Sequence, residues 1–181
     1  MNRILRPDLA RVILEVGIIK FGAFRLKLHE KQPSAPLSPI YLSFRKPPKG
    51  PLTDDLIRQL SRDLLYDIAR MKLLRYQGVV GVPEAGDPFA EAFAKQVKVP
   101  QLWLDKEERD GKRRIAPRLF NELRVEAGIS EGDRLLVIDD LITQADSKLE
   151  AVEALRSRGQ VVEDVLVLVD REQGGREALE R

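Results

Sequence analysis

The apolar positions along the chain follow two periods, one typical of helices and one typical of buried strands. Apolar residues three and four positions apart predict a short helix over residues 7–17 and a long amphipathic helix from Thr53 to Met71. Thr53 suits the N-cap of this second helix. Continuous apolar runs predict buried strands with further helices between them. The strands cover residues 78–83, 102–104, 135–138 and 161–169, and the further helices cover residues 88–97 and 147–158.

The predicted strands are apolar on consecutive residues instead of alternate ones, and helices separate most of them. Strands of that kind are buried on both faces, as in a parallel sheet that helices cover on each side. The pattern therefore predicts an α/β fold with a mostly parallel central sheet flanked by helices.

The segment before the long helix differs in composition from the rest of the chain. Residues 20–49 carry seven basic side chains and one acidic side chain, and six of the 11 prolines fall between residues 33 and 51. Proline cannot donate to a central ladder, so we expect loops and short edge strands here. The excess positive charge indicates an anionic partner. We therefore expect an N-terminal helix and hood segment, residues 1–50, and an α/β core, residues 51–181, within one compact domain.

Composition excludes several kinds of chemistry. The 181-residue chain has no cysteine and one histidine, so disulfides, a thiolate nucleophile and a Cys/His zinc cluster are excluded. Its 31 basic and 29 acidic residues give a formal charge of +2, and only 6% of its residues are aromatic. Both values disfavour nucleic-acid binding. The N-terminal residues lack the apolar core of a signal peptide and no apolar run is long enough to span a membrane, so we expect a cytoplasmic protein without membrane contact.

A highly charged segment follows the apolar run at residues 102–104. Residues 105–118 contain six basic and four acidic side chains and almost no apolar ones. That composition is typical of a mobile surface loop and is too polar for the core. It predicts either a solvated connector or a basic loop that closes over an anionic ligand.

The candidate chemistry lies where the strand at residues 135–138 ends. Asp139 and Asp140 follow it directly, and a polar loop from Thr143 to Ser147 leads into the next helix. Ligands of parallel sheets bind beyond the carboxyl ends of the strands. Such a loop can hold a phosphate, and the two acids can meet ribose hydroxyls or a hydrated Mg²⁺. An Asp-rich helix cap explains the same residues without a ligand, and spacing alone leaves both interpretations open.

The sequence around this strand resembles a known signature. Residues 135–155, LLVIDDLITQADSKLEAVEAL, resemble the phosphoribosyl diphosphate (PRPP) signature of type I phosphoribosyltransferases. Further segments resemble orotate phosphoribosyltransferases in their usual order: KFGAFRLKL (20–28), SPIYLSFR (38–45), GVPEAGDPFA (81–90) and VLVLVDREQGG (165–175). The resemblance implies a type I phosphoribosyltransferase fold with an N-terminal hood. It also implies a homodimeric enzyme of pyrimidine biosynthesis that uses Mg²⁺ and converts PRPP and orotate to orotidine 5′-monophosphate and pyrophosphate.

By this resemblance, the PRPP site comprises the acidic pair and the loop that follows it. Asp139 and Asp140 would bind the ribose and, through water, the metal ion, and Asp140 would also take part in catalysis. Lys27 and Arg171 would hold orotate, together with Thr143. The full PRPP-binding set implied is Asp139, Asp140, Leu141, Ile142, Thr143, Gln144, Ala145, Asp146 and Ser147.

By the same resemblance, residues 105–118 correspond to the catalytic loop of the family. Lys106 and Arg109 match best the basic residues that close over the pyrophosphate, often from the neighbouring subunit. A closing basic loop stabilises a leaving diphosphate and excludes water. Further basic candidates in the segment are Lys112, Arg113 and Arg114.

The chain departs from the family pattern in its phosphate loop. Ala145 and Asp146 stand where the family commonly has two glycines. A carboxylate at position 146 would repel a phosphate unless it turned to solvent or bound the metal. Three functions stay open: a divergent orotate phosphoribosyltransferase, a catalytically impaired relative that senses PRPP or a nucleotide or regulates a partner, and a transferase acting on another base.

Overall fold

The computed structural model describes residues 5–26, 28–70, 75–109, 112–117 and 128–181. They form two compact units, one within residues 5–56 and one within residues 57–181. Within the described ranges, none of the helices has both the length and the apolar character that crossing a membrane requires.

The first unit contains a helix and a small antiparallel sheet. Helix α1 (Pro7–Glu15) has proline in its first turn and buries Leu9 and Ile13. Strands β1 (Ile19–Phe24) and β2 (Ser38–Leu42) pair antiparallel, and the short helix α2 (Leu28–Lys31) lies between them in the chain. The expected leading helix and short strands of the proline-rich segment are therefore confirmed.

Helix α3 (Asp54–Arg70) begins at the residue after Thr53. The hydroxyl of Thr53 accepts a hydrogen bond from the backbone N–H of Leu56 at 3.2 Å. This bond satisfies one of the free N–H groups at the start of the helix, so the predicted N-cap is confirmed.

The second unit is built on a four-stranded parallel sheet in the order β4-β3-β7-β8. Its strands are β3 (Gly78–Gly81), β4 (Gln101–Leu102), β7 (Arg134–Ile142) and β8 (Val161–Asp170). The chain runs from β3 to β4 on one side and later returns to place β7 on the other. The strand order thus reverses between β3 and β7, and the crevice at such a switch point is where parallel sheets bind ligands.

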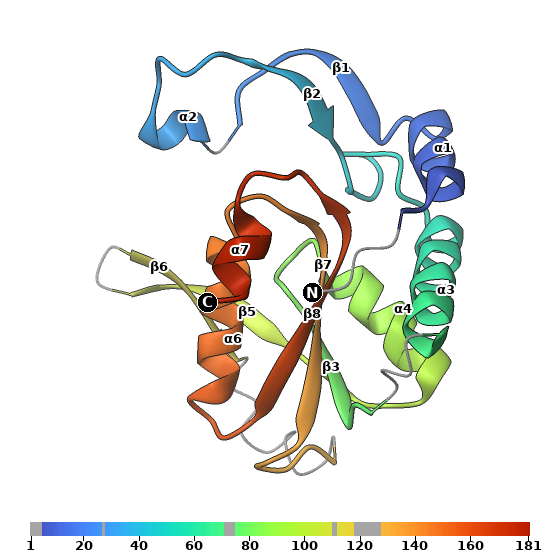
Figure 1. Ribbon diagram of the computed structural model, residues 1–181, viewed down its shortest axis with the longest axis vertical. Coiled ribbons are helices and arrows are strands. Elements are labelled where there is room, and N and C mark those ends of the chain that lie inside the picture. Colours follow the sequence, from blue (N-terminus) through green and yellow to red (C-terminus); the bar gives the residue numbers. More distant parts are fainter. Residues whose placement is uncertain (1–4, 27, 71–74, 110–111, 118–127) are drawn as a thin grey trace. The chain divides into compact units, whose positions relative to one another are not determined.

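Helices cover both faces of this sheet (Figure 1). Helix α4 (Asp87–Val97) packs one side with Phe89 and Phe93, both almost fully buried. Helix α6 (Asp146–Arg156) packs the other side, and the last helix, α7 (Gly175–Leu179), contacts α6. The central strands β3 and β7 are mostly buried, whereas the edge strands β4 and β8 are mostly half-buried. The α/β fold is confirmed.

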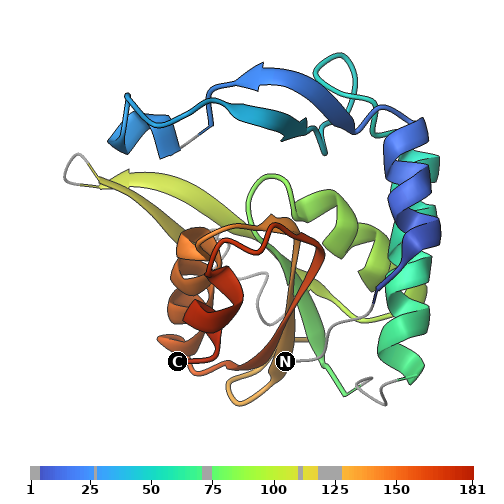
Figure 2. The ribbon, with the colours of Figure 1, turned by 45° about the horizontal axis from the view of Figure 1, so that its top comes forward.

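Residues 104–117 correct one expectation. They form a β-hairpin of β5 (Leu104–Arg109) and β6 (Lys112–Pro117) instead of a loop, and Figure 2 shows it extending past α6. The segment is also not wholly outside the core, because Leu104 and Ile115 are buried with residues of β7 and α6. Two apolar side chains at the base suffice to anchor a ribbon that is otherwise charged.

Candidate active site at the sheet edge

The turn after β3 is hydrogen-bonded to β7 at the residue just before the acidic pair. The N–H of Val82 donates to the carbonyl oxygen of Ile138 at 2.9 Å, and the N–H of Gly86 donates to the carbonyl oxygen of Val82 at 2.9 Å. A methyl group on Gly86 would lie 2.3 Å from the Ile138 oxygen, so only glycine permits this contact. The turn and the end of β7 thus form one edge of the switch-point crevice.

The acidic pair lies within β7 and not after it. The strand was expected to end at Ile138, but its ladder with β8 continues through Asp139 to Ile142. Strand β7 is longer than expected because the ten residues of β8 pair with it as far as Asp170. Side chains of a regular strand alternate between its faces, but here the carboxyl groups of Asp139 and Asp140 lie within hydrogen-bonding reach of each other.

Asp139 is buried against a lysine that sequence analysis did not single out. Its Oδ2 forms an ion pair with the Nζ of Lys148 in the first turn of α6. Its Oδ1 accepts the backbone N–H of Asp140 at 2.9 Å. Both oxygens of Asp139 therefore already have protein partners.

Asp140 lies at the carboxyl end of the sheet in a different environment. Its Oδ1 accepts the backbone N–H of Leu141 at 2.7 Å. Burial, and then the neighbouring charge of Asp139, raise the pKa of Asp140 from 3.8 to about 7. A carboxyl group with a raised pKa at the edge of a crevice is typical of a functional site.

The loop from Thr143 to Ser147 leads into the amino end of α6. Ala145 adopts the left-handed conformation, with φ of 70°, that glycine adopts at lower cost, and its carbonyl accepts the N–H groups of Lys148 and Leu149 at 2.8 and 2.9 Å. Asp146 is exposed, whereas the side chains of Thr143 and Ser147 are half-buried. The side chain of Asp146 thus lies toward solvent, which is one of the two conditions under which we expected its carboxylate not to repel a phosphate. The N–H groups of a first helical turn have no partner inside the helix and favour anions.

The segment after β8 lies beside this loop. The N–H of Arg171 donates to the carbonyl oxygen of Ile142 at 3.1 Å, and Gly175, at the start of α7, packs against Thr143. The N–H of Glu172, which has a φ of 53°, donates to the carboxylate of Asp170 at 2.8 Å. Arg171 is half-buried and is held next to the end of β7. The structure thus brings together Thr143 and Arg171, two of the residues expected at one ligand.

The other residues expected at the site lie in the hairpin or outside the residues that the structure describes. Lys106 is half-buried on β5, where its backbone is paired with Ile115. Arg109 ends the same strand, and its side chain lies outside the described part of the chain. Lys27 also lies outside the described residues. The assignment of the hairpin and of residue 27 to the site therefore stays a prediction.

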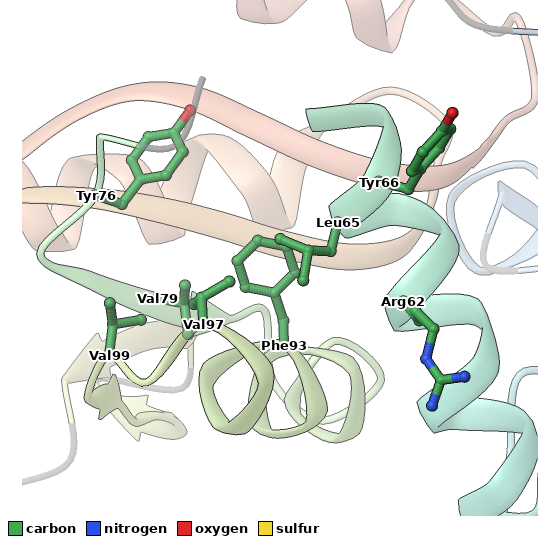
Figure 3. A pocket seen from close by; sticks show the side chains of 8 residues that line it. All are labelled: Arg62, Leu65, Tyr66, Tyr76, Val79, Phe93, Val97 and Val99. Atoms are coloured by element: carbon green, nitrogen blue, oxygen red, sulfur yellow. The ribbon is translucent and has the colours of Figure 1, made fainter. Parts of the chain in front are cut away.

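A cavity of about 560 Å³ lies at the other end of the sheet (Figure 3). Tyr76 and Val79, at the start of β3, contribute to its lining, whereas the acidic pair lies at the carboxyl end of β7. The Tyr76 hydroxyl donates to Asp164 at 2.7 Å, and burial followed by this bond raises the pKa of Tyr76 well above its usual range. The cavity is mostly apolar and is separate from the crevice. The other lining residues are Arg62, Leu65, Tyr66, Phe93, Val97 and Val99.

Comparisons with known proteins agree with this geometry. No family model matches the chain. The chain is 32% identical over 181 residues to the uridine 5′-monophosphate synthase of Caenorhabditis elegans, and the alignment covers 99% of this chain and 33% of that protein. It is 31% identical over 179 residues to the orotate phosphoribosyltransferase of Pyrococcus furiosus, with 98% of this chain and 87% of that protein covered. The chain thus spans about a third of the synthases it matches and most of the archaeal transferase.

Comparison with solved structures gives the same family. The fold matches the crystal structure of orotate phosphoribosyltransferase from Aeropyrum pernix with a TM-score of 0.73 and 29% sequence identity. The match covers 96% of this chain and 87% of that one. The type I phosphoribosyltransferase fold that the sequence predicted is therefore confirmed. The chain belongs to the orotate phosphoribosyltransferase family.

Proposed function

We propose that this protein transfers the phosphoribosyl group of PRPP to orotate, giving orotidine 5′-monophosphate and pyrophosphate. The observation that carries the proposal is the meeting of three segments at one sheet edge: the end of β7 with Asp140, the loop from Thr143 to Ser147, and the Arg171 segment. Together they offer an acid for ribose hydroxyls, N–H groups for a phosphate and a cation for an anionic base. Relatives that match nearly the whole of this chain are named for this activity.

The loop and the amino end of α6 would hold the 5′-phosphate of PRPP. The amino end of α6 follows this loop directly, and the N–H groups of a first helical turn favour an anion. The helix dipole adds a partial positive charge at the same end. The half-buried hydroxyls of Thr143 and Ser147 are suited to donate to the phosphate oxygens.

The reaction is a displacement at C1′ of the ribose. The bond from C1′ to the diphosphate oxygen breaks with both electrons leaving on oxygen. A ring nitrogen of orotate forms the new bond to C1′ and gives up its proton, which passes to the released pyrophosphate or to water. The sugar is cationic in between, so the nearby negative charge of Asp140 stabilises it while cations stabilise the leaving diphosphate. On this proposal Lys106 and Arg109 of the hairpin supply those cations, and closure of the hairpin excludes water.

Orotate would lie beside the segment after β8. Its carboxylate and ring oxygens are anionic or polar, and a guanidinium binds such groups in a planar, bidentate manner. The backbone hydrogen bond that holds Arg171 next to Ile142 supports that role. By the family resemblance, Lys27 is the second cation for the base.

Mg²⁺ fits this site only if the substrate and the protein bind the ion together. Among the described residues, no group of three or more acidic, histidine or cysteine side chains could hold a metal ion. Mg²⁺ is commonly bound by one or two carboxylates together with substrate phosphates and water, and Asp140 can be such a carboxylate. When bound, the ion would neutralise charge on the diphosphate, with Asp140 as its protein contact through water. Mg²⁺ dependence, a homodimer and a cytoplasmic location are parts of the same proposal.

The test is an incubation of the purified protein with PRPP, Mg²⁺ and a panel of orotate, uracil, adenine, guanine and hypoxanthine. Pyrophosphate and each nucleotide are followed by mass spectrometry. We expect orotidine 5′-monophosphate with orotate alone. Omission of Mg²⁺ should abolish product, and light scattering should give twice the mass of the chain.

Other outcomes would replace the proposal. A different nucleotide would keep the chemistry and change the base. A folded protein that PRPP stabilises against heat without forming any product would instead be a sensor or regulator on a transferase fold.

A further inference from the structure

Lys148 places a positive charge inside the protein, directly beside the site. Its Nζ is paired with Asp139 Oδ2, and the two side chains are only 9% and 5% exposed. Lysine is almost never buried to this degree unless it is paired. The pair is therefore a built feature of this chain and not an incidental surface contact.

The position of Lys148 follows from the packing of α6 on the sheet. Lys148, Ala151 and Leu155 are buried along one face of the helix, at spacings of three and four residues. Val137 and Asp139 alternate along the matching face of β7. The ion pair thus occupies the layer of this interface that lies nearest the carboxyl edge of the sheet.

This pairing makes the two acids of β7 unequal. Asp139 has one oxygen on the ammonium of Lys148 and the other on the N–H of Asp140. Asp140 has one oxygen on the N–H of Leu141, and its carboxyl group is hydrogen-bonded to the side chain of Asp139. The charge of Asp139 is balanced by Lys148 and its side chain is buried, whereas Asp140 is half-buried and remains accessible to a ligand.

We infer that Lys148 is a positioning residue that holds Asp139 as an internal counter-ion, so that Asp140 alone of the pair meets the ribose. The inference rests on the proposed function for the identity of the ligand. PRPP carries several negative charges, and a second unbalanced carboxylate at its site would repel it. Lys148 removes that repulsion and fixes the end of β7.

The test compares Lys148→Met, Asp139→Asn and the double variant with the wild-type protein. Each single change leaves one buried charge without its partner, and the double change removes both charges while keeping similar shapes. We expect each single variant to lower the unfolding temperature by several degrees and the double variant to recover most of that loss.

The kinetic expectation separates positioning from simple stabilisation. In Lys148→Met we expect the KM for PRPP to rise about tenfold with kcat within threefold, because the released carboxylate acts on binding of an anion. The double variant should return KM to within about threefold of wild type. Asp140→Asn, the matched change at the neighbouring acid, should lower kcat about a hundredfold. If Lys148→Met does not fold, Lys148→Gln, which retains a hydrogen-bond donor without charge, takes its place.

Two results would overturn the inference. A folded double variant that loses as much activity as Asp140→Asn would mean that Asp139 itself touches the ligand. Single variants as stable as the wild-type protein would mean that the two charges are not coupled. The stability comparison and the PRPP-induced rise in unfolding temperature need no turnover, so they decide the inference even if the orotate assay fails.

Discussion

Gly175 lies against the carbonyl oxygen of Thr143 so closely that a methyl group on Gly175 would be 2.3 Å from that oxygen. This contact joins the start of α7 to the loop that leads into α6. The relative position of the two proposed ligand-binding segments therefore depends on the absence of one side chain.

Replacing Gly175 by alanine should separate those segments. We expect kcat/KM to fall roughly 10- to 100-fold, because a displacement of about 1 Å is enough to misplace reacting groups. Steady-state kinetics with PRPP and orotate measure the effect. Glu177→Ala, an exposed change on the same helix, should leave activity unchanged. Wild-type kinetics in Gly175→Ala would show that the contact does not position the site.

Asp140 should make the fold less stable at neutral pH. Its folded pKa of about 7 lies above the ordinary 3.8, so the folded state holds a proton that the unfolded state has lost between those values. Stability from this group is complete below about pH 4 and is lost as the pH rises through about 7. Asp140→Asn should raise the free energy of unfolding at pH 8 by roughly 2–4 kcal/mol, while activity is lost.

Urea unfolding at pH 4.5 and pH 8 measures this difference. The gain should be smaller at the lower pH, where Asp140 is largely protonated. Glu153→Gln, an exposed change on α6, serves as the control. An equal effect of Asp140→Asn at both pH values would contradict the raised pKa.

Arg171 should act on the base and not on PRPP. We expect Arg171→Ala to raise the KM for orotate at least about tenfold, since a charged hydrogen bond to a carboxylate contributes roughly 1.5–3 kcal/mol. The KM for PRPP should stay within about twofold. Arg176→Ala, on the exposed side of α7 where Arg176 pairs with Glu180, is the control. A larger effect on PRPP than on orotate would move Arg171 to the diphosphate.

Lys106 should matter for turnover more than for folding. We expect Lys106→Ala to lower kcat about a hundredfold, as for removal of a group that stabilises transition-state charge. Its unfolding free energy should change by less than about 1 kcal/mol. Glu108→Ala, an exposed change on the same strand, should leave both values unaltered. Full activity in Lys106→Ala would remove the hairpin from the catalytic machinery.

Ile115 should anchor the hairpin. Its side chain is 8% exposed and belongs to the core cluster with Leu104 and Val137. Ile115→Ala should cost about 2–4 kcal/mol of stability through lost burial and the cavity left behind. The exposed neighbour Arg114→Ala should cost far less. Thermal unfolding of the two variants gives the comparison, and equal losses would mean that residue 115 is not part of the core.

The sheet and its helices could be predicted because their patterns are local. The apolar residues from Leu135 to Ile138 indicate a buried strand in any context, and Thr53 indicates a helix start from its own side chain. The hairpin could not be predicted in the same way. Its strands carry charged residues at most positions, so only Leu104 and Ile115 carry a signal, and they lie 11 residues apart in sequence.

The chemistry of the acidic pair was predicted only in part. Adjacent acids after an apolar run indicate a ligand edge, but the burial of Asp139 depends on a lysine nine positions later. A signal was present, because Lys148 continues the buried face of Ala151 and Leu155 at helical spacing. A lysine at such a position is normally assigned to solvent, and only the packed helix shows that the ammonium has a partner.

The parallel pairing of β3 with β7 also affects how the protein is made. Gly78 is in register with Leu135, 57 positions later, so β3 leaves the ribosome long before its neighbour exists. At ordinary elongation rates the delay is roughly 3 to 12 seconds. During that interval the nascent chain carries Val79 and Val80, both fully buried in the finished sheet, without β7 to cover them. In that interval these apolar residues can bind a chaperone or aggregate with other chains.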